Sequence, residues 1–231
     1  MKILGMEKLS LVDFDGYVAS TLFTGGCNFR CPFCHNSPLV LNYQKVQEIS
    51  LEEIENFFNK RKGIIEGVCI TGGEPTLYND LPNLCEFIKK FGLKVKLDTN
   101  GTNPQMIKTL FDSGLCDYFA MDIKNDKDNY SKIIGIENFN TSLVEKSVEL
   151  FLTSNINYEF RTTLIEEFHK EENIYAIGKW IKGANKYFMQ KFKNGENCIC
   201  NELSPVSEQE ANAFVNIIKQ FVPNTKLRGY N

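Results

Sequence analysis

The chain has 231 residues, of which 42% are hydrophobic and 24% charged, so it is long enough to bury one sizeable core. A formal net charge of −3 at pH 7 gives no electrostatic basis for binding nucleic acid or an anionic membrane. We therefore expect a single domain over residues 1–231 that binds neither.

The start of the chain does not have the composition of a leader, and no segment has that of a membrane span. Residues 1–16 place Glu7 and Asp13 among their apolar residues, and no run approaches the roughly 20 apolar residues that a membrane helix needs. These features predict a cytoplasmic protein. Because thiols are kept reduced in the cytosol, we expect the clustered cysteines to serve metal binding or catalysis rather than disulfides.

Apolar, β-branched and aromatic residues recur in runs of strand length. The predicted strands cover residues 17–24, 67–71, 93–99, 118–124, 157–164 and 186–192. Helical patterns fill the intervals. A capping box, in which serine is followed by glutamate three residues later, appears at Ser50, Ser142 and Ser207, while Pro82 and Pro104 fit the first turns of two more helices.

Strand and helix alternating about six times predict right-handed crossovers and a parallel sheet covered by helices. A complete eightfold barrel takes about 250 residues, so six units indicate an α/β fold with a partial, open (β/α)6 parallel barrel of the TIM-barrel type. A doubly wound sheet is the alternative. We expect the core over residues 17–192 and a C-terminal helical extension over residues 193–231.

Polar motifs follow the predicted strands. The cysteine-rich segment follows the first strand, GGEP (72–75) follows the second, DTNG (98–101) ends the third and DIK (122–124) ends the fourth, while Arg161 lies late in the fifth. Because the C-terminal ends of parallel strands meet at one rim, we expect these motifs to lie on the same rim.

Three thiols in one loop suggest a metal centre. Cys27, Cys31 and Cys34 have C-x3-C-x2-C spacing, whereas a structural zinc site takes four ligands, usually as two separated pairs. A four-iron cluster held by three thiolates is the better interpretation, because it leaves one iron open to a substrate. Zinc is the alternative, with Cys198 and Cys200 as a distant source of a fourth ligand or a second metal site.

The motifs together resemble those of a known family. CNFRCPFC (27–34) and GGEP resemble the two motifs of radical S-adenosylmethionine (SAM) enzymes. The extension to CHN (34–36), with DTNG and MDIK, is similar to the activating enzymes of glycyl radical enzymes. Residues 10–192 most resemble activating proteins of the anaerobic ribonucleoside-triphosphate reductase.

The resemblance implies a [4Fe-4S] cluster on Cys27, Cys31 and Cys34 that reductively cleaves SAM. The resulting 5′-deoxyadenosyl radical would generate a glycyl radical on the partner enzyme, with flavodoxin or ferredoxin as electron donor and no catalytic residue beyond the cluster. The alternatives are activation of another glycyl radical enzyme of the pyruvate formate-lyase type, a radical SAM enzyme with a small-molecule substrate, and a zinc-binding interaction module.

The resemblance also implies a set of cofactor contacts. We expect the SAM site to include Phe33, Cys34, His35, Gly72, Gly73, Glu74, Asp98, Asp122, Lys124, Arg161 and Gln190. An internal ion pair is the alternative role for Asp122 and Lys124. Outside this set, His169 is expected on the solvated surface, and Cys69 and Cys85 in the core.

Overall fold

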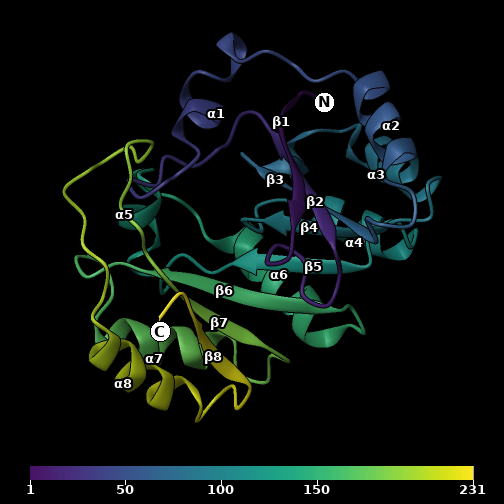
Figure 1. Cartoon of the computed structure of the whole chain (residues 1–231). Coiled ribbons are helices and arrows are strands. Elements are labelled where there is room, and N and C mark those ends of the chain that lie inside the picture. Colours follow the sequence, from purple (N-terminus) through teal and green to yellow (C-terminus); the bar gives the residue numbers. More distant parts are fainter. Residues whose placement is uncertain (231) are drawn as a thin grey trace. The chain divides into compact units, whose positions relative to one another are not determined.

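The computed structural model describes residues 1–230, in which eight strands alternate with helices (Figure 1). The strands are β1 (Ile3–Ser10), β2 (Ala19–Thr24), β3 (Gly67–Gly72), β4 (Lys94–Thr99), β5 (Tyr118–Asp122), β6 (Tyr158–Leu164), β7 (Tyr187–Lys191) and β8 (Thr225–Arg228). The helices are α1 (Ser37–Leu41), α2 (Leu51–Lys60), α3 (Leu81–Lys89), α4 (Pro104–Asp112), α5 (Tyr130–Ile134), α6 (Ser142–Thr153), α7 (Glu171–Trp180) and α8 (Glu208–Ile218), with short 3-10 turns at Tyr43–Lys45 and Pro75–Leu77. Each helix among the described residues is too short or too polar to cross a membrane.

The strands follow one another in the sheet in chain order, from β1 to β8. β1 pairs antiparallel with β2, whereas β2 with β3, β3 with β4, β6 with β7 and β7 with β8 pair in parallel. The predicted α/β fold with an open, mostly parallel sheet is confirmed. All six predicted strands form, with ends within two residues of the prediction.

The structure adds two strands that the sequence analysis did not predict. β1 is an antiparallel edge strand whose central residues Glu7, Lys8 and Leu9 are exposed, so it has little of the apolar alternation of a half-buried strand. β8 is only four residues long and lies in the segment expected to be a helical extension. That segment contains α8 as expected, but it also closes with a strand.

Most predicted helix starts are confirmed. The Ser50 and Ser207 side chains accept hydrogen bonds from the backbone N–H groups three residues later. The third predicted capping box is wrong. Thr141 rather than Ser142 is the N-cap of α6, and its side chain makes no capping hydrogen bond but donates to the Glu145 carboxylate at 2.6 Å.

The described residues group into two compact units, and the single domain expected from the sequence stays a prediction. The first unit comprises residues 1–28 and 36–119, and the second comprises residues 29–35 and those from 120 onward. In the first unit β1 to β4 carry the apolar core. Its central side chains, fully shielded from solvent, are Leu22, Val68, Ile70, Val95 and Leu97.

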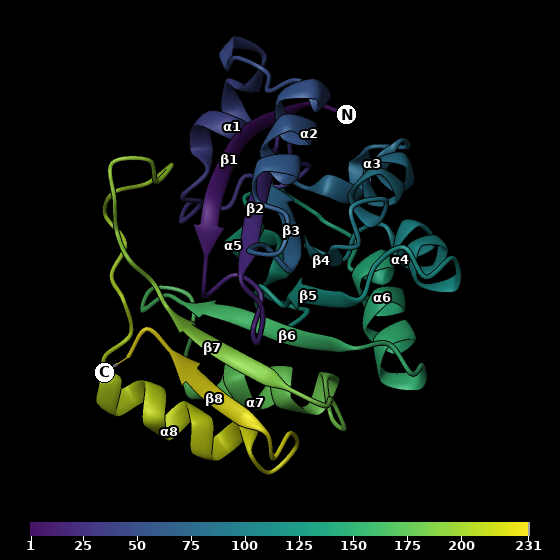
Figure 2. The ribbon, with the colours of Figure 1, turned by 45° about the vertical axis from the view of Figure 1, so that its right-hand side comes forward.

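In the second unit α7 and α8 cover one face of β6, β7 and β8 (Figure 2). An ion pair fixes the short last strand. The Arg228 guanidinium donates from both terminal nitrogens to Glu159 at 2.7 and 3.2 Å and lies 3.4 Å from the Phe188 ring centre. Glu159 is only 1% exposed, and a buried carboxylate requires a cationic partner. Arg228 of β8 is that partner.

Candidate functional site

In the first unit, the end of β3 makes a backbone contact with the loop after β2 that leaves no room for side chains. Gly72 has φ +107°, and a Cβ on it would lie 2.5 Å from the Thr24 backbone. A Cβ on Gly73 would lie 1.8 Å from the Gly26 carbonyl oxygen. The Gly73 and Glu74 N–H groups donate to the Thr24 and Gly26 carbonyls, both at 2.8 Å. The two glycines therefore join β3 to the start of the cysteine loop.

Glu74 is a buried carboxylate that ties the ends of β3 and β4 together. Its side chain accepts hydrogen bonds from the Thr76 hydroxyl at 2.5 Å, the Thr99 hydroxyl at 2.7 Å and the Asn100 N–H at 2.6 Å. Burial raises the pKa of Glu74, and these hydrogen bonds oppose the rise. Glu74 therefore links the loop after β3 to the loop after β4, and its expected contact with SAM stays a prediction.

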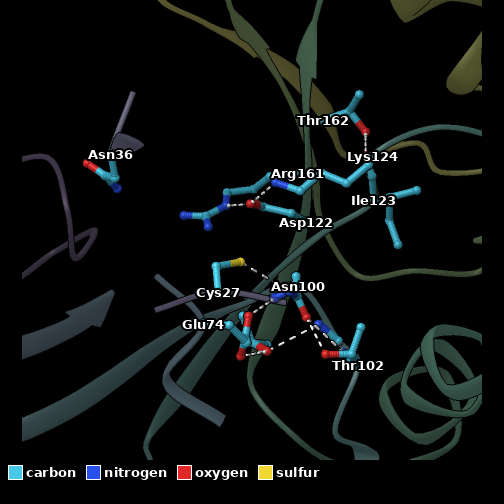
Figure 3. Close-up of polar contacts among 12 residues, drawn as sticks. Cys27, Asn36, Glu74, Asn100, Thr102, Asp122, Ile123, Lys124, Arg161 and Thr162 are labelled. Atoms are coloured by element: carbon cyan, nitrogen blue, oxygen red, sulfur yellow. Dashed lines mark hydrogen bonds and ion pairs between the residues drawn. The ribbon is translucent and has the colours of Figure 1, made fainter. Parts of the chain in front are cut away.

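A chain of amides and hydroxyls leads from Glu74 to Cys27 (Figure 3). The Asn100 side-chain amide donates to the Asn28 carbonyl oxygen at 2.8 Å and lies 3.9 Å from the Cys27 sulfur. Its own side-chain oxygen accepts from the Thr102 hydroxyl at 2.7 Å. The sequence analysis missed Asn100, although it lies within the DTNG motif. Only the folded loops reveal that its amide is directed at the cysteine loop.

Two other motif residues of the first unit have protein partners. Asp98 lies 3.2 Å from the ammonium of Lys96, which is only 4% exposed. The Asn36 side-chain amide donates to the Gly72 carbonyl at 3.0 Å. Asn36 therefore links the CHN motif to the GGEP turn, while the place of Asp98 in a ligand pocket stays a prediction.

In the second unit, the cysteine loop makes a tight turn. The Cys34 N–H donates to the Cys31 carbonyl at 3.0 Å, and the Arg30 N–H donates to the Ile134 carbonyl at 2.8 Å at the end of α5. Cys31 and Phe33 are 7% and 5% exposed. The turn is therefore held in the second unit by a hydrogen bond to the end of α5 and by the burial of two of its side chains.

The segment after β7 contacts the same loop. The Cys200 N–H donates to the Pro32 carbonyl at 2.8 Å. The exposed His35 stacks on Phe192 with ring centres 5.5 Å apart, and its Nε2 contacts the Lys193 carbonyl oxygen. These contacts hold His35 in place, and its expected position beside adenine stays a prediction.

Asp122, Lys124 and Arg161 form a charged cluster in the second unit (Figure 3). The two Asp122 carboxylate oxygens lie 2.8 Å from the Lys124 ammonium and 2.9 Å from the Arg161 Nε. The Lys124 ammonium also lies 5.6 Å from the Phe33 ring centre. The ion pair considered as an alternative is therefore present, and Arg161 extends it.

The Asp122 carboxylate and its two cations stabilise each other's charged forms. Burial alone would raise the pKa of Asp122, but Arg161 and Lys124 outweigh it and lower that pKa to about 2. Burial likewise opposes the charge of Lys124, but Asp122 and then Cys31 raise its pKa above the ordinary value. The Asp122 carboxylate is therefore paired with two cations, Lys124 and Arg161.

The expectation for His169 is wrong. The sequence placed it on the solvated surface, but its side chain is fully buried. Its Nε2 lies 3.0 Å from the Lys124 carbonyl oxygen and its Nδ1 lies 3.0 Å from the Ile165 N–H nitrogen. Many neighbouring residues in the sequence, such as Glu167 and Lys170, are charged, so the local pattern indicated an exposed segment. The burial of His169 arises only from tertiary packing.

Gln190 is the penultimate residue of β7 and lies on the same face of the sheet as Arg161. It pairs with Thr163, two residues after Arg161 in β6, so all three side chains leave one face. Gln190 is half-buried. Gln190 and Arg161 therefore share one face of the sheet, and the expected contact of Gln190 with SAM stays a prediction.

All eight cysteines are thiols, and all lie within the described residues. Cys69 and Cys85 are core residues as expected, at 1% and 0% exposure. Cys198 is buried and Cys200 half-buried. Among residues 1–230, no three His, Cys, Asp or Glu side chains are grouped as ligands of one metal ion, and a second metal site at Cys198 and Cys200 stays a prediction.

The loop chemistry nevertheless fits an iron–sulfur cluster. Reduced cysteines are the ligands such clusters require, and C-x3-C-x2-C spacing offers three of them. Cys27 belongs to the first unit, and Cys31 and Cys34 belong to the second. The ligand set itself stays a prediction from spacing.

A family model for the radical SAM superfamily matches residues 21–176, about two thirds of the chain. A protein of Methanocaldococcus jannaschii named "Putative glycyl-radical enzyme activating enzyme" is 30% identical over 99% of this chain and 96% of its own length. The pyruvate formate-lyase-activating enzyme of Clostridium pasteurianum is 26% identical over 80% of this chain and 85% of its own length.

Solved structures support the fold. A domain of the pyruvate-formate lyase-activating enzyme from Bacteroides vulgatus matches with a TM-score of 0.58 at 17% identity, covering 71% of this chain and 99% of that chain. Streptococcus suis SuiB bound to S-adenosylmethionine matches with a TM-score of 0.67 at 14% identity, covering 90% of this chain and 52% of that chain. The matched family works with a [4Fe-4S] cluster and SAM. The chain belongs to the radical SAM superfamily.

Proposed function

We propose that this radical SAM enzyme is an activating enzyme that generates a glycyl radical on a partner enzyme. The observation that carries the proposal is the end-to-end match, 99% of this chain against 96% of the relative, to a protein named as an activating enzyme of this kind. The small-molecule radical SAM enzymes among the relatives match shorter parts. The 7-carboxy-7-deazaguanine synthase of Aquifex aeolicus, for example, covers 33% of this chain.

When bound, the cluster and SAM supply a 5′-deoxyadenosyl radical that takes a hydrogen atom from a glycine Cα of the partner. The protein itself positions the cofactors and excludes water from them. We assign the SAM carboxylate to the charged cluster of Asp122, Lys124 and Arg161, because its two cations exceed its one carboxylate.

The other expected contacts extend this assignment. We assign adenine to the aromatic pair Phe33 and His35, and the methionine amino group to the backbone of the Gly72–Gly73 turn. This assignment rests on the resemblance of GGEP to the second motif of the family, since the Thr24 and Gly26 backbone fills the space beside the two glycines. Asp98 and Gln190 are the remaining residues that we assign to SAM binding.

We further propose the anaerobic ribonucleoside-triphosphate reductase as the partner, on the resemblance of residues 10–192 to its activating proteins. Flavodoxin or ferredoxin is the proposed electron donor. An enzyme of the pyruvate formate-lyase type is the second candidate, because the C. pasteurianum activating enzyme matches 80% of the chain.

The test is anaerobic reconstitution with iron and sulfide, followed by reduction and addition of SAM with each candidate partner in turn. A doublet radical signal in the partner, together with released 5′-deoxyadenosine, supports the activase function and identifies the partner. Nucleoside release without a partner radical in either mixture supports the small-molecule alternative. A colourless protein with stoichiometric zinc supports the interaction module.

Two cysteine variants make the assay specific. Cys31→Ala should abolish nucleoside release, because it removes a proposed cluster ligand. Cys85→Ala is the matched control, since it removes a thiol from the core side of α3. Full nucleoside release by the Cys31 variant would remove the cluster assignment.

A further inference from the structure

The buried His169 has no place in the chemistry described above. It lies between β6 and α7 with 0% of its surface exposed. Burial lowers its pKa to about 4, although hydrogen bonds to backbone groups oppose the change. The ring is therefore neutral at physiological pH, with one N–H donor and one acceptor nitrogen.

Its neighbours decide which nitrogen carries the proton. Nε2 faces the Lys124 carbonyl oxygen at 3.0 Å, and a carbonyl oxygen only accepts. Nδ1 lies 3.0 Å from the Ile165 nitrogen and 3.2 Å from the Ile165 carbonyl oxygen, which already accepts from the His169 N–H. A hydrogen on Nε2 satisfies both sides of the ring, because Nε2 then donates to Lys124 while Nδ1 accepts the Ile165 N–H. His169 thus links the backbone after β6 to the backbone after β5.

This link is one of several that fix the segment after β5, among them hydrogen bonds from the Ile123 N–H to the Arg161 carbonyl at 2.8 Å and from the Lys124 N–H to the Tyr130 hydroxyl at 3.4 Å. The Thr162 hydroxyl donates to the Ile123 carbonyl at 2.6 Å (Figure 3), and the Asn125 amide donates to the Phe168 carbonyl at 2.9 Å. His169 holds the residue between them. Three consecutive residues of the DIK segment and its extension are therefore tied to β6 and the loop that follows it.

The position of the Lys124 backbone determines what its ammonium reaches. The Lys124 Nζ lies 2.8 Å from Asp122 and 5.6 Å from the Phe33 ring centre, with its side chain 16% exposed. A shift of the carbonyl would move the start of this side chain and change both contacts.

We propose that His169 is a positioning residue, which holds the Lys124 backbone so that Lys124 and Asp122 are presented to SAM. The inference rests on the proposed SAM contacts of these two residues. It assigns a function to a residue that no motif includes. It also explains why a histidine occupies a fully buried position, since an apolar side chain would leave the Lys124 carbonyl and the Ile165 N–H without this partner.

Two substitutions separate positioning from simple core packing. Glutamine places an amide near the position of Nε2 and keeps a donor for the Lys124 carbonyl. Asparagine places an amide near Nδ1 and keeps only the Ile165 contact. SAM affinity is measured by calorimetry on the anaerobically reconstituted full chain without reductant, so that no turnover occurs and no partner enzyme is needed.

We expect His169→Asn to weaken SAM binding about five- to tenfold, the effect of losing about one hydrogen bond. His169→Gln should stay within about twofold of the parent. In a Lys124→Met background, which should itself weaken binding, His169→Asn should have a clearly smaller effect than in the parent, because the Lys124 contact on which both changes act is already lost. Free energies of unfolding, measured alongside, report packing loss separately.

Equal SAM affinities for the two His169 variants would overturn the inference, whatever their stabilities. So would an additive effect of His169→Asn and Lys124→Met, or normal SAM binding by Lys124→Met alone. Failure to form a radical on any partner would instead refute the proposed function. The binding measurement does not depend on it, so the two failures are distinguishable.

Discussion

Replacing His169 by glutamine should change how the stability of the protein depends on pH. In the folded chain burial lowers the pKa of this histidine from 6.5 to about 4. Between these two values the unfolded chain binds a proton that the folded chain does not, so stability falls as the pH falls. The stability that the neutral, buried His169 contributes is fully present above about pH 6.5 and is lost progressively as the pH falls toward 4.

The magnitude follows from the two pKa values. Between pH 7 and pH 5 the proton linkage of this one group amounts to about 2 kcal/mol. Carboxylates also titrate in this range, but they do so in parent and variant alike. The quantity to compare is therefore the difference in unfolding free energy between the parent and His169→Gln, which should move by about 2 kcal/mol in favour of the variant between pH 7 and pH 5.

Urea denaturation of the full chain without its cluster, under reducing conditions, measures this difference. The single tryptophan, Trp180, is the last residue of α7, so its fluorescence reports unfolding of the second unit. His169→Asn should show the same pH effect as His169→Gln, because neither side chain ionises. A difference between parent and variants that is the same at both pH values would refute the burial argument.

Three other substitutions test the packing around the candidate site. Gly73→Ala should cost about 3 kcal/mol or more in urea denaturation, because its Cβ would lie 1.8 Å from a carbonyl oxygen. Gly195→Ala, which meets no atom within 4 Å, should leave stability unchanged. Asp122→Asn should cost about 3 kcal/mol at pH 7, since it leaves two cations facing each other. Because its lowered pKa is about 2, the loss should shrink only below about pH 4, and an equal loss at pH 3 and pH 7 would count against the ion cluster. Arg228→Met should cost about 3 kcal/mol, and adding Glu159→Gln should restore part of it, because the double change leaves no buried charge. No recovery in the double variant would show that packing, rather than charge, makes the contribution.

Local patterns carried the prediction of the parallel core. Each central strand is an apolar run bounded by a turn, and the helices between them begin at caps such as Ser50 and Ser207. Such signals involve residues within four positions of one another, so they can be read without the fold. The two outer strands lacked them. β1 has an exposed polar stretch, and β8 depends on a salt bridge to Glu159, 69 residues away.

The sequence by itself determined the residue types and spacings of the candidate site: three thiols in one loop, a glycine pair and a charged segment, each after a predicted strand. Tertiary structure alone decided what these residues contact. It joined Asp122 to Arg161 across 39 positions, turned Asn100 toward Cys27, and buried His169 against the Lys124 carbonyl. The reason is physical. The spacing of residues along the chain determines which ligands one loop can offer. The burial of side chains and the pairing of distant polar groups depend instead on which strands lie side by side.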